Sequence, residues 1–243
     1  MSNRFYVEGE QRGAKVNDLF ARVAPRYDLI NDLQSFGLHR AWKRRVVRMA
    51  GVRPGERALD VCCGTGDLAF ALARAGAEVS ALDFSAAMLD VARRRAAITN
   101  HQSSILNPQF QSGDAMRLPF ADNLFDVVTV GYGLRNLSSW ETGLREMHRV
   151  AKPGARLLVL DFGKPDNAVW RALYFAYLRC FVPLFGKLFC GDAATHAYIL
   201  ESLQRYPAQR GVAEAMQRLG CRDARIVNLL GGAMSINYGV KAG

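Results

Sequence analysis

Arg135 and Asn136 are two strongly polar side chains that follow a buried apolar segment, FDVVTV at residues 125–130. The intervening Gly131 and Gly133 allow the backbone to turn sharply or to approach a ligand closely. A fixed guanidinium stabilises a developing oxyanion, and an amide orients a hydroxyl group or a water molecule. Because ligands bind beyond the carboxyl ends of strands in open α/β sheets, this stretch predicts the reacting end of a site. The alternative is that both residues cap the strand structurally, by satisfying loop carbonyls.

A glycine loop, GTGDLA at residues 64–69, follows the apolar segment RALDVC and fits the pattern G-x-G-x-x-A. With Asp83 at the end of the next apolar segment, the pattern is compatible with a nicotinamide-dinucleotide site whose pyrophosphate lies at a helix N-terminus. Asp60 and Asp67, however, place negative charge around this loop. Such charge disfavours phosphates and favours a cationic, phosphate-free nucleoside such as S-adenosylmethionine, which carries a sulfonium.

Strands and helices alternate regularly around these candidate residues. Strands are expected at 57–62, 78–83, 109–114, 125–130 and 155–162, and helices at 67–76, 85–97 and about 140–150. Asp67 and Ser85 are expected to cap the first two helices, because an acceptor side chain satisfies free amides at a helix N-terminus. This alternation predicts an α/β fold with a mostly parallel sheet and right-handed crossovers.

The segments that flank the alternation have other patterns. A tail is expected at 1–16, helices at 17–50, an apolar helical insert near 167–206, a helix at 208–220, and strands at 221–230 and 232–242. The last two strands are expected to form a hairpin that closes one edge of the sheet. The most apolar span, 168–189, contains three cations and Pro183, so it is not expected to be a transmembrane helix.

The composition indicates a soluble globular protein, with half of its 243 residues apolar and 22% charged. Its net charge of +10 allows nucleic acid, an anionic membrane surface or an anionic substrate as a partner. Five cysteines without a C-x-x-C pair argue against a zinc site and a disulfide framework, so no metal is predicted. The first fifteen residues lack the apolar region of a signal peptide, so the protein is expected to be cytoplasmic.

The loop DVCCGTG, the dipeptide LD at 82–83 and the stretch GDAMRLPF at 113–120 resemble the seven-stranded S-adenosylmethionine-dependent methyltransferases. The resemblance implies a Rossmann-like, seven-stranded sheet with an antiparallel C-terminal strand. It also implies a set of cofactor-binding residues: Gly64, Thr65, Gly66, Asp83, Asp114, Ala115 and Gly131. In that set Asp83 holds both ribose hydroxyls, and Asp114 with the Ala115 amide meets the adenine edge. Cys62 stands where the usual first glycine of the loop is found.

GLRN at 133–136, with RYDLINDLQSFGLHRAWKR, DVCCGTGDLA, RLPFADNLFD and HRVAKPGARLLVLDFGKP, resembles the ubiquinone/menaquinone biosynthesis C-methyltransferase family. The resemblance runs from about Val16 to the C-terminal strand. It implies C-methylation of a polyprenyl hydroquinone, with demethylmenaquinol favoured over the ubiquinone-pathway benzoquinol. It also implies that residues 1–50 form a tail and a helical lid, including Tyr27 and Asp28, over a methyltransferase domain at 51–243.

The implied chemistry requires an activated acceptor, because an aromatic carbon is a poor nucleophile until a neighbouring hydroxyl loses its proton. An ordinary phenol has a pKa of about 10. Arg135 would stabilise the phenolate and Asn136 would orient the hydroxyl or a water molecule. Three proton acceptors remain open: a water molecule, His39 or His196. For His39 an equal alternative is a place on a solvated basic face with Arg40 and Lys43.

Several partners and rival functions remain open from the sequence. Nucleic acid is disfavoured, because no Pro-Pro-aromatic motif follows the fourth strand and no Pro-Cys nucleophile is found. The insert at 168–189 either lines a channel for the prenyl tail or packs on the sheet, and the basic stretch 39–48 is a candidate for peripheral contact with anionic lipid. A homodimer is a further option. The rivals are a methyltransferase for a soluble phenol, a non-catalytic S-adenosylmethionine-binding partner and a dinucleotide oxidoreductase.

Overall fold

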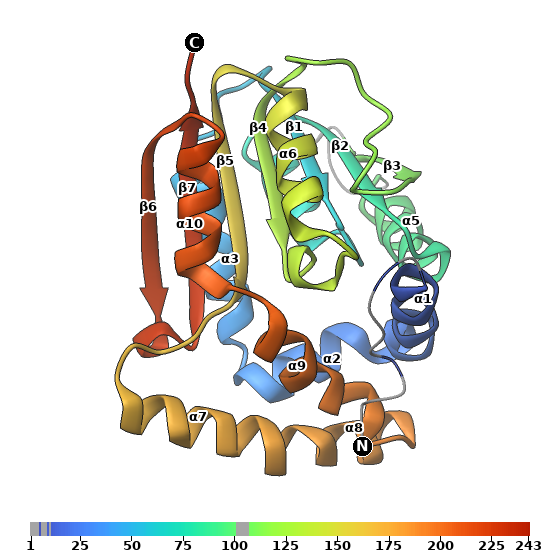
Figure 1. The fold of residues 1–243 in the computed structure, drawn as a ribbon. Helices are drawn as coiled ribbons and strands as arrows, with labels where there is room; N and C mark the ends of the chain where they lie inside the picture. The colour runs from blue at the N-terminus through green and yellow to red at the C-terminus, as the bar shows by residue number, and fades with distance from the viewer. Residues whose placement is uncertain (1–4, 6–8, 10, 101–106) are drawn as a thin grey trace.

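A seven-stranded sheet forms the centre of the protein in a computed structural model, which describes residues 5, 9, 11–100 and 107–243 (Figure 1). The strands, in chain order, are β1 Arg57–Val61, β2 Glu78–Asp83, β3 Gln109–Ser112, β4 Phe125–Gly131, β5 Ala151–Phe162, β6 Cys221–Leu229 and β7 Met234–Lys241. They lie in the order β3-β2-β1-β4-β5-β7-β6. β7 pairs antiparallel with both β5 and β6, whereas the other pairs are parallel. The predicted fold class and the C-terminal hairpin at the sheet edge are therefore confirmed.

The central strands are apolar runs because helices cover both of their faces. α3 Leu38–Ala50 and α4 Asp67–Arg74 pack on one face of the sheet, where Val46, Leu72 and Leu158 belong to one buried cluster. α6 Trp140–Val150 and α10 Ala208–Arg218 pack on the other face. α5 Ala86–Asn100 lies beside β2 and β3. The order of the strands reverses between β1 and β4: β2 and β3 follow on one side of β1, whereas β4 and β5 follow on the other. Ligands bind at such a switch point in sheets of this kind.

The N-terminal helices and the insert gather at the carboxyl ends of the parallel strands (Figure 1). They are α1 Arg12–Val23, the short η1 Ala24–Arg26, α2 Tyr27–Ser35, α7 Ala168–Cys180, α8 Val182–Cys190 and α9 Ala194–Arg205. Hydrogen bonds between described residues join the two groups: Arg26 Nη1 donates to Phe189 O at 2.7 Å, and Tyr177 Oη donates to Gln34 O at 3.3 Å. Segments that lie far apart in the sequence therefore meet at the carboxyl ends of the parallel strands.

Three details of the expected helices are wrong. The first helix begins at Arg12, so the tail does not extend to residue 16. Gly66, at φ 88°, occupies the N-cap position of α4 without a side-chain cap, and Asp67 forms ion pairs instead. The hydroxyl of Ser85 accepts no capping hydrogen bond before α5, because it is buried without a partner among the described residues.

Candidate active site

A cavity of about 360 Å³ lies at the carboxyl ends of β1, β2 and β4. We call it the strand-end cavity. Five of the predicted cofactor-binding residues line it: Gly64, Asp83, Asp114, Ala115 and Gly131. They come from four separate segments, and the sheet brings them together because parallel strands end at a common edge.

Asp83 is held rigidly at the end of β2. Its Oδ2 accepts a hydrogen bond from the Gly64 amide at 2.7 Å, and its Oδ1 accepts one from the Ser85 amide at 2.8 Å. Burial raises the pKa of this carboxyl, and the two amides oppose the rise. Each carboxylate oxygen has a second lone pair, so Asp83 can still accept two further hydrogen bonds from a diol in the cavity.

The glycine loop turns sharply at Cys62, which has a φ of 54° in the left-handed region that glycine prefers. The structure thus explains why related loops carry glycine at this position. Gly133 accommodates the cysteine, because a β-carbon at residue 133 would collide with Cβ of Cys62. The strand end that carries Arg135 and the glycine loop are therefore fitted to each other.

Thr65 and Gly66 do not line the strand-end cavity. Thr65 Oγ1 donates to Asp28 Oδ1 at 2.8 Å, which ties the loop to α2. A β-carbon on Gly66 would lie 3.0 Å from atoms of both Phe70 and Phe110, so packing explains the glycine. Their contact with a cofactor remains a prediction, and so does the lid, whereas the contact of Asp28 with the glycine loop is seen in the structure.

Asp67 does not contribute free negative charge to the loop. Lys43 Nζ lies 2.7 Å from its Oδ2, and Arg95 Nη2 lies 2.7 Å from its Oδ1. These two cations, acting against burial, lower the pKa of Asp67. The expectation that Asp67 makes the loop attractive to a cation is wrong, because its charge is already paired.

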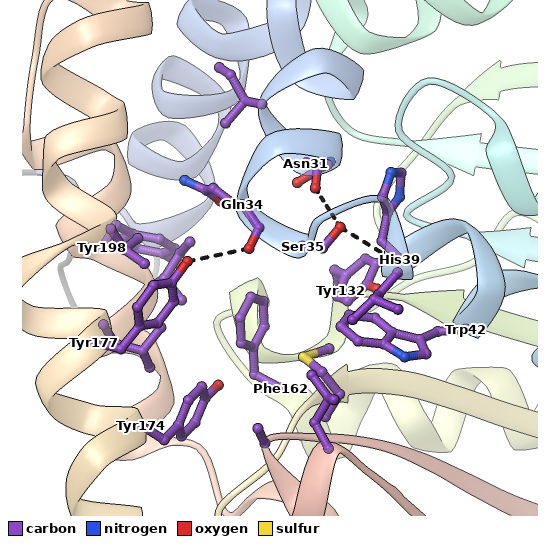
Figure 2. A pocket seen from close by; sticks show the side chains of 18 of the residues that line it. Asn31, Gln34, Ser35, His39, Trp42, Tyr132, Phe162, Tyr174, Tyr177 and Tyr198 are labelled. Atoms are coloured by element: carbon purple, nitrogen blue, oxygen red, sulfur yellow. Dashed lines mark hydrogen bonds between the residues drawn. The ribbon is translucent and has the colours of Figure 1, made fainter.

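A second cavity, of about 410 Å³, lies between the sheet edge and the helices α2, α7 and α9. Most of the side chains that line it are aliphatic or aromatic, and we call it the apolar cavity. Figure 2 shows Trp42, Tyr132, Phe162 and Tyr174 around this space. Arg135 is the only arginine among the residues lining it in the described part of the chain.

Arg135 is buried and held by three segments of the chain. Its Nη1 donates to Ser202 Oγ of α9 at 2.6 Å and to Asn136 Oδ1 at 2.9 Å. Its Nε lies 3.2 Å from Asp161 Oδ1 at the end of β5, and the guanidinium carbon lies 4.8 Å from the centre of the Phe162 ring. Arg12 of α1 donates to the Arg135 carbonyl at 2.6 Å. Nη2 has no hydrogen-bond partner among the described residues, so this donor remains for a ligand.

Arg135 and Asn136 face different cavities although they are adjacent in the sequence. Arg135 lines the apolar cavity, and Asn136 lines the strand-end cavity. Asn136 Nδ2 donates to the Tyr132 carbonyl at 3.0 Å, which holds the turn in place. The alternative that both residues only cap the strand therefore holds in part for Asn136. Arg135 differs, because its Nη2 donor has no partner among the described residues.

Three aromatic side chains form a wall common to both cavities: Phe20, Tyr27 and Tyr132. Tyr132 has a φ of 62°, a conformation that side chains rarely adopt and that tends to occur at functional sites. Its hydroxyl is buried without a partner among the described residues. Burial raises the pKa of Tyr27 to about 12, so the wall is uncharged.

Several buried polar atoms around the apolar cavity have no partner among the described residues: Asn31 Nδ2, Gln34 Nε2, His39 Nδ1, Tyr132 Oη and Tyr174 Oη. Buried polar groups are normally hydrogen-bonded, because an unpaired one costs about 1–3 kcal/mol. An apolar cavity with this inventory suits a ligand that combines a few oxygen atoms with a large hydrocarbon surface.

His39 is not part of a solvated basic face, contrary to one expectation. It is buried, its Nε2 lies 2.7 Å from Asp32 Oδ1, and Lys43 is buried as well. Burial lowers the pKa of His39, with Asp32 opposing, which favours the neutral imidazole at neutral pH. The side chain of His196 lies outside the described residues, so its candidacy as a proton acceptor stays a prediction.

Residues 7–241 match the model of the ubiE/COQ5 methyltransferase family. The chain belongs to this family. It is 42% identical over 238 residues to the ubiquinone/menaquinone biosynthesis C-methyltransferase UbiE of Azotobacter vinelandii, covering 97% of this chain and 93% of that one. It is 40% identical over 236 residues to the demethylmenaquinone methyltransferase of Desulfitobacterium hafniense, covering 96% and 92% of the two chains.

Solved structures confirm the methyltransferase fold of this ubiE/COQ5 family member. One is an S-adenosylmethionine-dependent methyltransferase of Thermotoga maritima, with a TM-score of 0.64 at 18% identity, covering 92% of this chain and 98% of that one. Another is the magnesium protoporphyrin IX methyltransferase of Synechocystis with bound S-adenosylhomocysteine, with a TM-score of 0.56 at 19% identity, covering 98% and 92% of the two chains.

S-Adenosylmethionine is the cofactor of this family member, and the strand-end cavity fits it. The buried carboxylate of Asp83 has lone pairs for a ribose diol, and Asp114 and Ala115 lie at the same strand ends. The cavity volume of about 360 Å³ lies within the usual range for small-ligand sites.

Asp60, buried under the glycine loop, predicts a pH dependence of stability. Burial raises its pKa to about 7, with a hydrogen bond from Thr129 Oγ1 at 2.8 Å opposing the rise. In the unfolded chain it titrates near 4, so between about pH 4 and 7 the folded state binds more protons. The free energy of unfolding therefore falls as the pH rises through this window.

We expect Asp60→Asn to weaken that fall. Between pH 5 and 7 the free energy of unfolding of the wild type should fall by about 2 kcal/mol more than that of the variant. Urea denaturation of both proteins at the two pH values measures the difference, in which the titration of the other groups cancels. Equal losses in the two proteins would mean that Asp60 is ionised throughout, contrary to its burial.

Two residues of the site were not predicted from the sequence, Asp161 and Ser202. Asp161 ends the strand beside β4, in the stretch LVLDF, so an acid at a neighbouring strand end was an available signal. Burial raises its pKa, and Arg135 opposes the rise. Ser202 reaches Arg135 from α9, 67 positions along the chain, and no local pattern indicates that contact.

Proposed function

We propose that this protein transfers a methyl group from S-adenosylmethionine to a ring carbon of a polyprenyl hydroquinone, in menaquinone or ubiquinone biosynthesis. The observation that carries the proposal is the pair of cavities with one common wall. The strand-end cavity has the polar groups that suit a nucleoside, and the apolar cavity ends at a buried arginine with a free donor. The relatives named above are a ubiquinone/menaquinone biosynthesis C-methyltransferase and a demethylmenaquinone methyltransferase.

The side chains of the apolar cavity activate the acceptor in this proposal. Arg135 donates to the quinol oxygen, stabilises the phenolate and so raises the electron density of the neighbouring ring carbon. Asp161 and Ser202 hold the guanidinium, so little reorganisation is needed when charge develops. The hydroxyl proton leaves to a water molecule or to an acceptor of the chain. Once the methyl group has bonded to the ring carbon, the hydrogen on that carbon leaves as a proton, the ring regains its aromaticity and the oxygen is reprotonated, so one proton is released per turnover.

The strand-end cavity positions the methyl donor. Asp83 holds the ribose, and Asp114 with Ala115 holds the adenine edge. When bound, S-adenosylmethionine supplies a methyl group that leaves its sulfonium with both bonding electrons remaining on sulfur. Transfer needs in-line approach and a dry site more than a strong catalytic group. The lid supports this by placing Tyr27 between the cavities and Asp28 on the glycine loop.

Demethylmenaquinol is the acceptor that we favour. The stretches GYGLRN and CCGTGDLAF resemble relatives of the naphthoquinone pathway more than those of the benzoquinone pathway. The prenyl tail would run through the apolar cavity along α7, whose Tyr174 and Leu178 line it. In this proposal the insert both packs on the protein and lines the channel for the prenyl tail. The two roles that the sequence left as alternatives for residues 168–189 would then hold together.

The test is transfer of a labelled methyl group in membranes supplied with reduced demethylmenaquinone or with its benzoquinol counterpart. We expect label in the naphthoquinol. Label in both quinols would make the enzyme bifunctional, and label in the benzoquinol alone would contradict the favoured acceptor. No label in either quinol, with cofactor binding intact, would contradict the quinol reaction itself.

Two rivals are separated by further measurements. A methyltransferase for a soluble phenol should keep its activity when the prenyl tail is shortened, whereas the quinol enzyme should lose affinity for the acceptor. A non-catalytic cofactor-binding partner should bind S-adenosylmethionine without turnover on any quinol. The free Nη2 donor of Arg135 supports an enzyme, because this residue lines the apolar cavity, where the donor can reach an oxygen atom of a bound acceptor.

The proposal places the protein in the cytoplasm, at the inner face of the membrane, because its acceptor partitions into lipid. The segment 168–189 is long and apolar enough to cross a membrane by length and composition, but α7 and α8, which form it, pack one side on the protein through Tyr174, Leu178 and Val182. We therefore propose peripheral contact. We also propose a homodimer. Size-exclusion chromatography with light scattering measures the molar mass in solution and so tests it.

A further inference from the structure

The outer sides of α7 and α8 expose large apolar side chains. Val169 is 71% exposed, Leu188 68%, Phe181 60%, Leu173 59% and Leu184 52%. We call these five residues the α7–α8 outer face. Exposed apolar residues are normal when they are scattered, but a row of them along two consecutive helices indicates an interaction surface.

The same helices also have an apolar inner side. Tyr174, Leu178, Val182 and Gly186, spaced four residues apart, are buried. A helix that is apolar on opposite sides is covered on both sides in its working state. The inner side is covered by the protein. In Figure 1, α7 and α8 form the outermost layer beyond the carboxyl ends of the strands, so the outer face points away from the domain.

The mouth of the apolar cavity opens beside this face. Several residues that line the cavity are themselves exposed: Phe36, Leu38, Trp170, Leu173 and Leu230. Phe36, at the end of α2, is 86% exposed. Trp170 Nε1 donates to Leu230 O at 2.9 Å, which joins α7 to the β6–β7 turn at the rim. Leu173 belongs both to the rim and to the outer face, so the two surfaces are continuous.

The charges on these helices have one sign. Residues 168–189 contain Arg171, Arg179 and Lys187, all exposed, and no Asp or Glu. Cations beside a row of apolar side chains complement anionic lipid headgroups and match the pattern of helices that lie in a membrane interface. A second copy of the chain would instead bring the same cations together, which disfavours self-association through this face.

We propose that the α7–α8 outer face docks on the surface of an anionic lipid bilayer and that the rim of the apolar cavity then opens into the bilayer. The acceptor would enter tail-last from the lipid, without passing through water. This inference rests on the proposed function for the identity of the acceptor, whereas the docking itself does not depend on it. His39 and Lys43 of the basic stretch 39–48 are buried, whereas Arg40, Arg44, Arg45 and Arg48 are exposed, so α3 is a rival docking surface that the experiments must distinguish.

The first experiment measures partition of the purified protein into vesicles of phosphatidylcholine with phosphatidylglycerol, in the absence of cofactor and acceptor. Leu188→Ser is paired with Ile98→Ser on α5, because Ile98 is similarly exposed, at 65%. We expect partition to fall about fivefold for Leu188→Ser and to stay unchanged for Ile98→Ser. The triple variant Phe181→Ser, Leu184→Ser, Leu188→Ser should fall at least about fiftyfold. None of these residues lines the apolar cavity.

The charge contribution is measured with a second pair of variants. Arg179→Gln with Lys187→Gln should weaken binding about tenfold on anionic vesicles and little on vesicles of phosphatidylcholine alone. Arg44→Gln with Arg45→Gln on α3, which removes two other exposed cations, is the control and should bind as the wild type does. If the α3 pair weakened binding and the Arg179/Lys187 pair did not, the docking surface would be α3 and the inference would be overturned.

Turnover separates this inference from the proposed function. The triple variant should lose at least about tenfold in activity on a long-tailed quinol in vesicles and none on a short-tailed, water-soluble quinol. A wild type that does not partition, or a triple variant that partitions equally well, would overturn the docking surface even if methylation is observed. Dimerisation abolished by Leu188→Ser would assign the face to a second copy and overturn the lipid proposal. Vesicle binding without turnover on any quinol would leave docking supported and contradict the proposed reaction.

Discussion

Arg135→Lys is expected to lower kcat for quinol methylation about 100-fold, with S-adenosylmethionine binding within about twofold of the wild type. Lysine keeps the positive charge beside Asp161 but replaces a planar fork of donors by a single ammonium group. It cannot hold Ser202, Asn136 and a quinol oxygen in the geometry of the guanidinium. Stopped-time assays of kcat and calorimetric titration of the cofactor measure the two effects separately.

Arg135→Ala is a less informative variant of the same position. It would leave the buried carboxylate of Asp161 without its cation, and removing one partner of a buried ion pair costs about 3–5 kcal/mol. The matched control for Arg135→Lys is Arg149→Lys, because Arg149 also bridges carboxylates but lines neither cavity. We expect the control to retain activity, since its arginine touches no substrate.

The pH dependence tests whether Arg135 acts on the quinol or only on the fold. If the guanidinium stabilises the phenolate, its loss raises the pKa of the bound hydroxyl, and the rising limb of kcat moves to higher pH. A quinol with a more acidic hydroxyl should regain part of the lost rate. An Arg135→Lys enzyme whose rate falls equally for all quinols at all pH values would show that the residue acts through the structure alone.

Asp83→Asn is expected to raise the Kd for S-adenosylmethionine about 10–100-fold, which corresponds to about 1.4–2.8 kcal/mol. The carboxylate accepts from the Gly64 and Ser85 amides with different oxygens and keeps lone pairs for a ribose diol. An amide has only one acceptor oxygen, so its NH₂ group would face either a backbone donor or a ribose hydroxyl that must donate. Isothermal titration calorimetry measures the affinity.

The control for Asp83→Asn is Asp126→Asn. Asp126 is a carboxylate near the amino end of β4, away from the strand-end cavity, and it is paired with Lys152. The variant should bind the cofactor normally. A 2′-deoxyribose analogue of the cofactor supplies a readout of direct contact: the wild type should discriminate against it and Asp83→Asn should not. If both proteins discriminate equally, Asp83 shapes the loop and does not hold the ribose.

Local patterns were sufficient to predict the elements of the sheet. The apolar segment 125–130 and the acid-terminated segment 78–83 became β4 and β2 almost residue for residue, because buried strands of a parallel sheet are continuous apolar runs. Helix starts were predicted less well. Asp67 was expected to cap α4, but Lys43 and Arg95 come from other helices and take both of its oxygens.

The site divides in the same way between local and distant causes. The motifs around Asp83, Asp114 and Arg135 indicated a methyltransferase and its chemistry by their resemblance to known families, and the position of these residues at strand ends predicted one common site, because parallel strands end on the same side of the sheet. The sequence could not indicate that Arg135 and Asn136 face different cavities, because a short turn beginning at the left-handed Tyr132 sets their directions.

The sequence by itself therefore determined the order of the elements, the ends of the strands at which we expect the cofactor, and the family to which the chain belongs. Periodicity and strand-end chemistry act over a few residues and are readable there. The tertiary structure alone decided that α9 supplies Ser202 to Arg135, that Asp161 balances its charge, and that α7 and α8 leave one apolar side uncovered. These contacts join segments tens of positions apart, and packing of the whole chain, rather than any local preference, selects them.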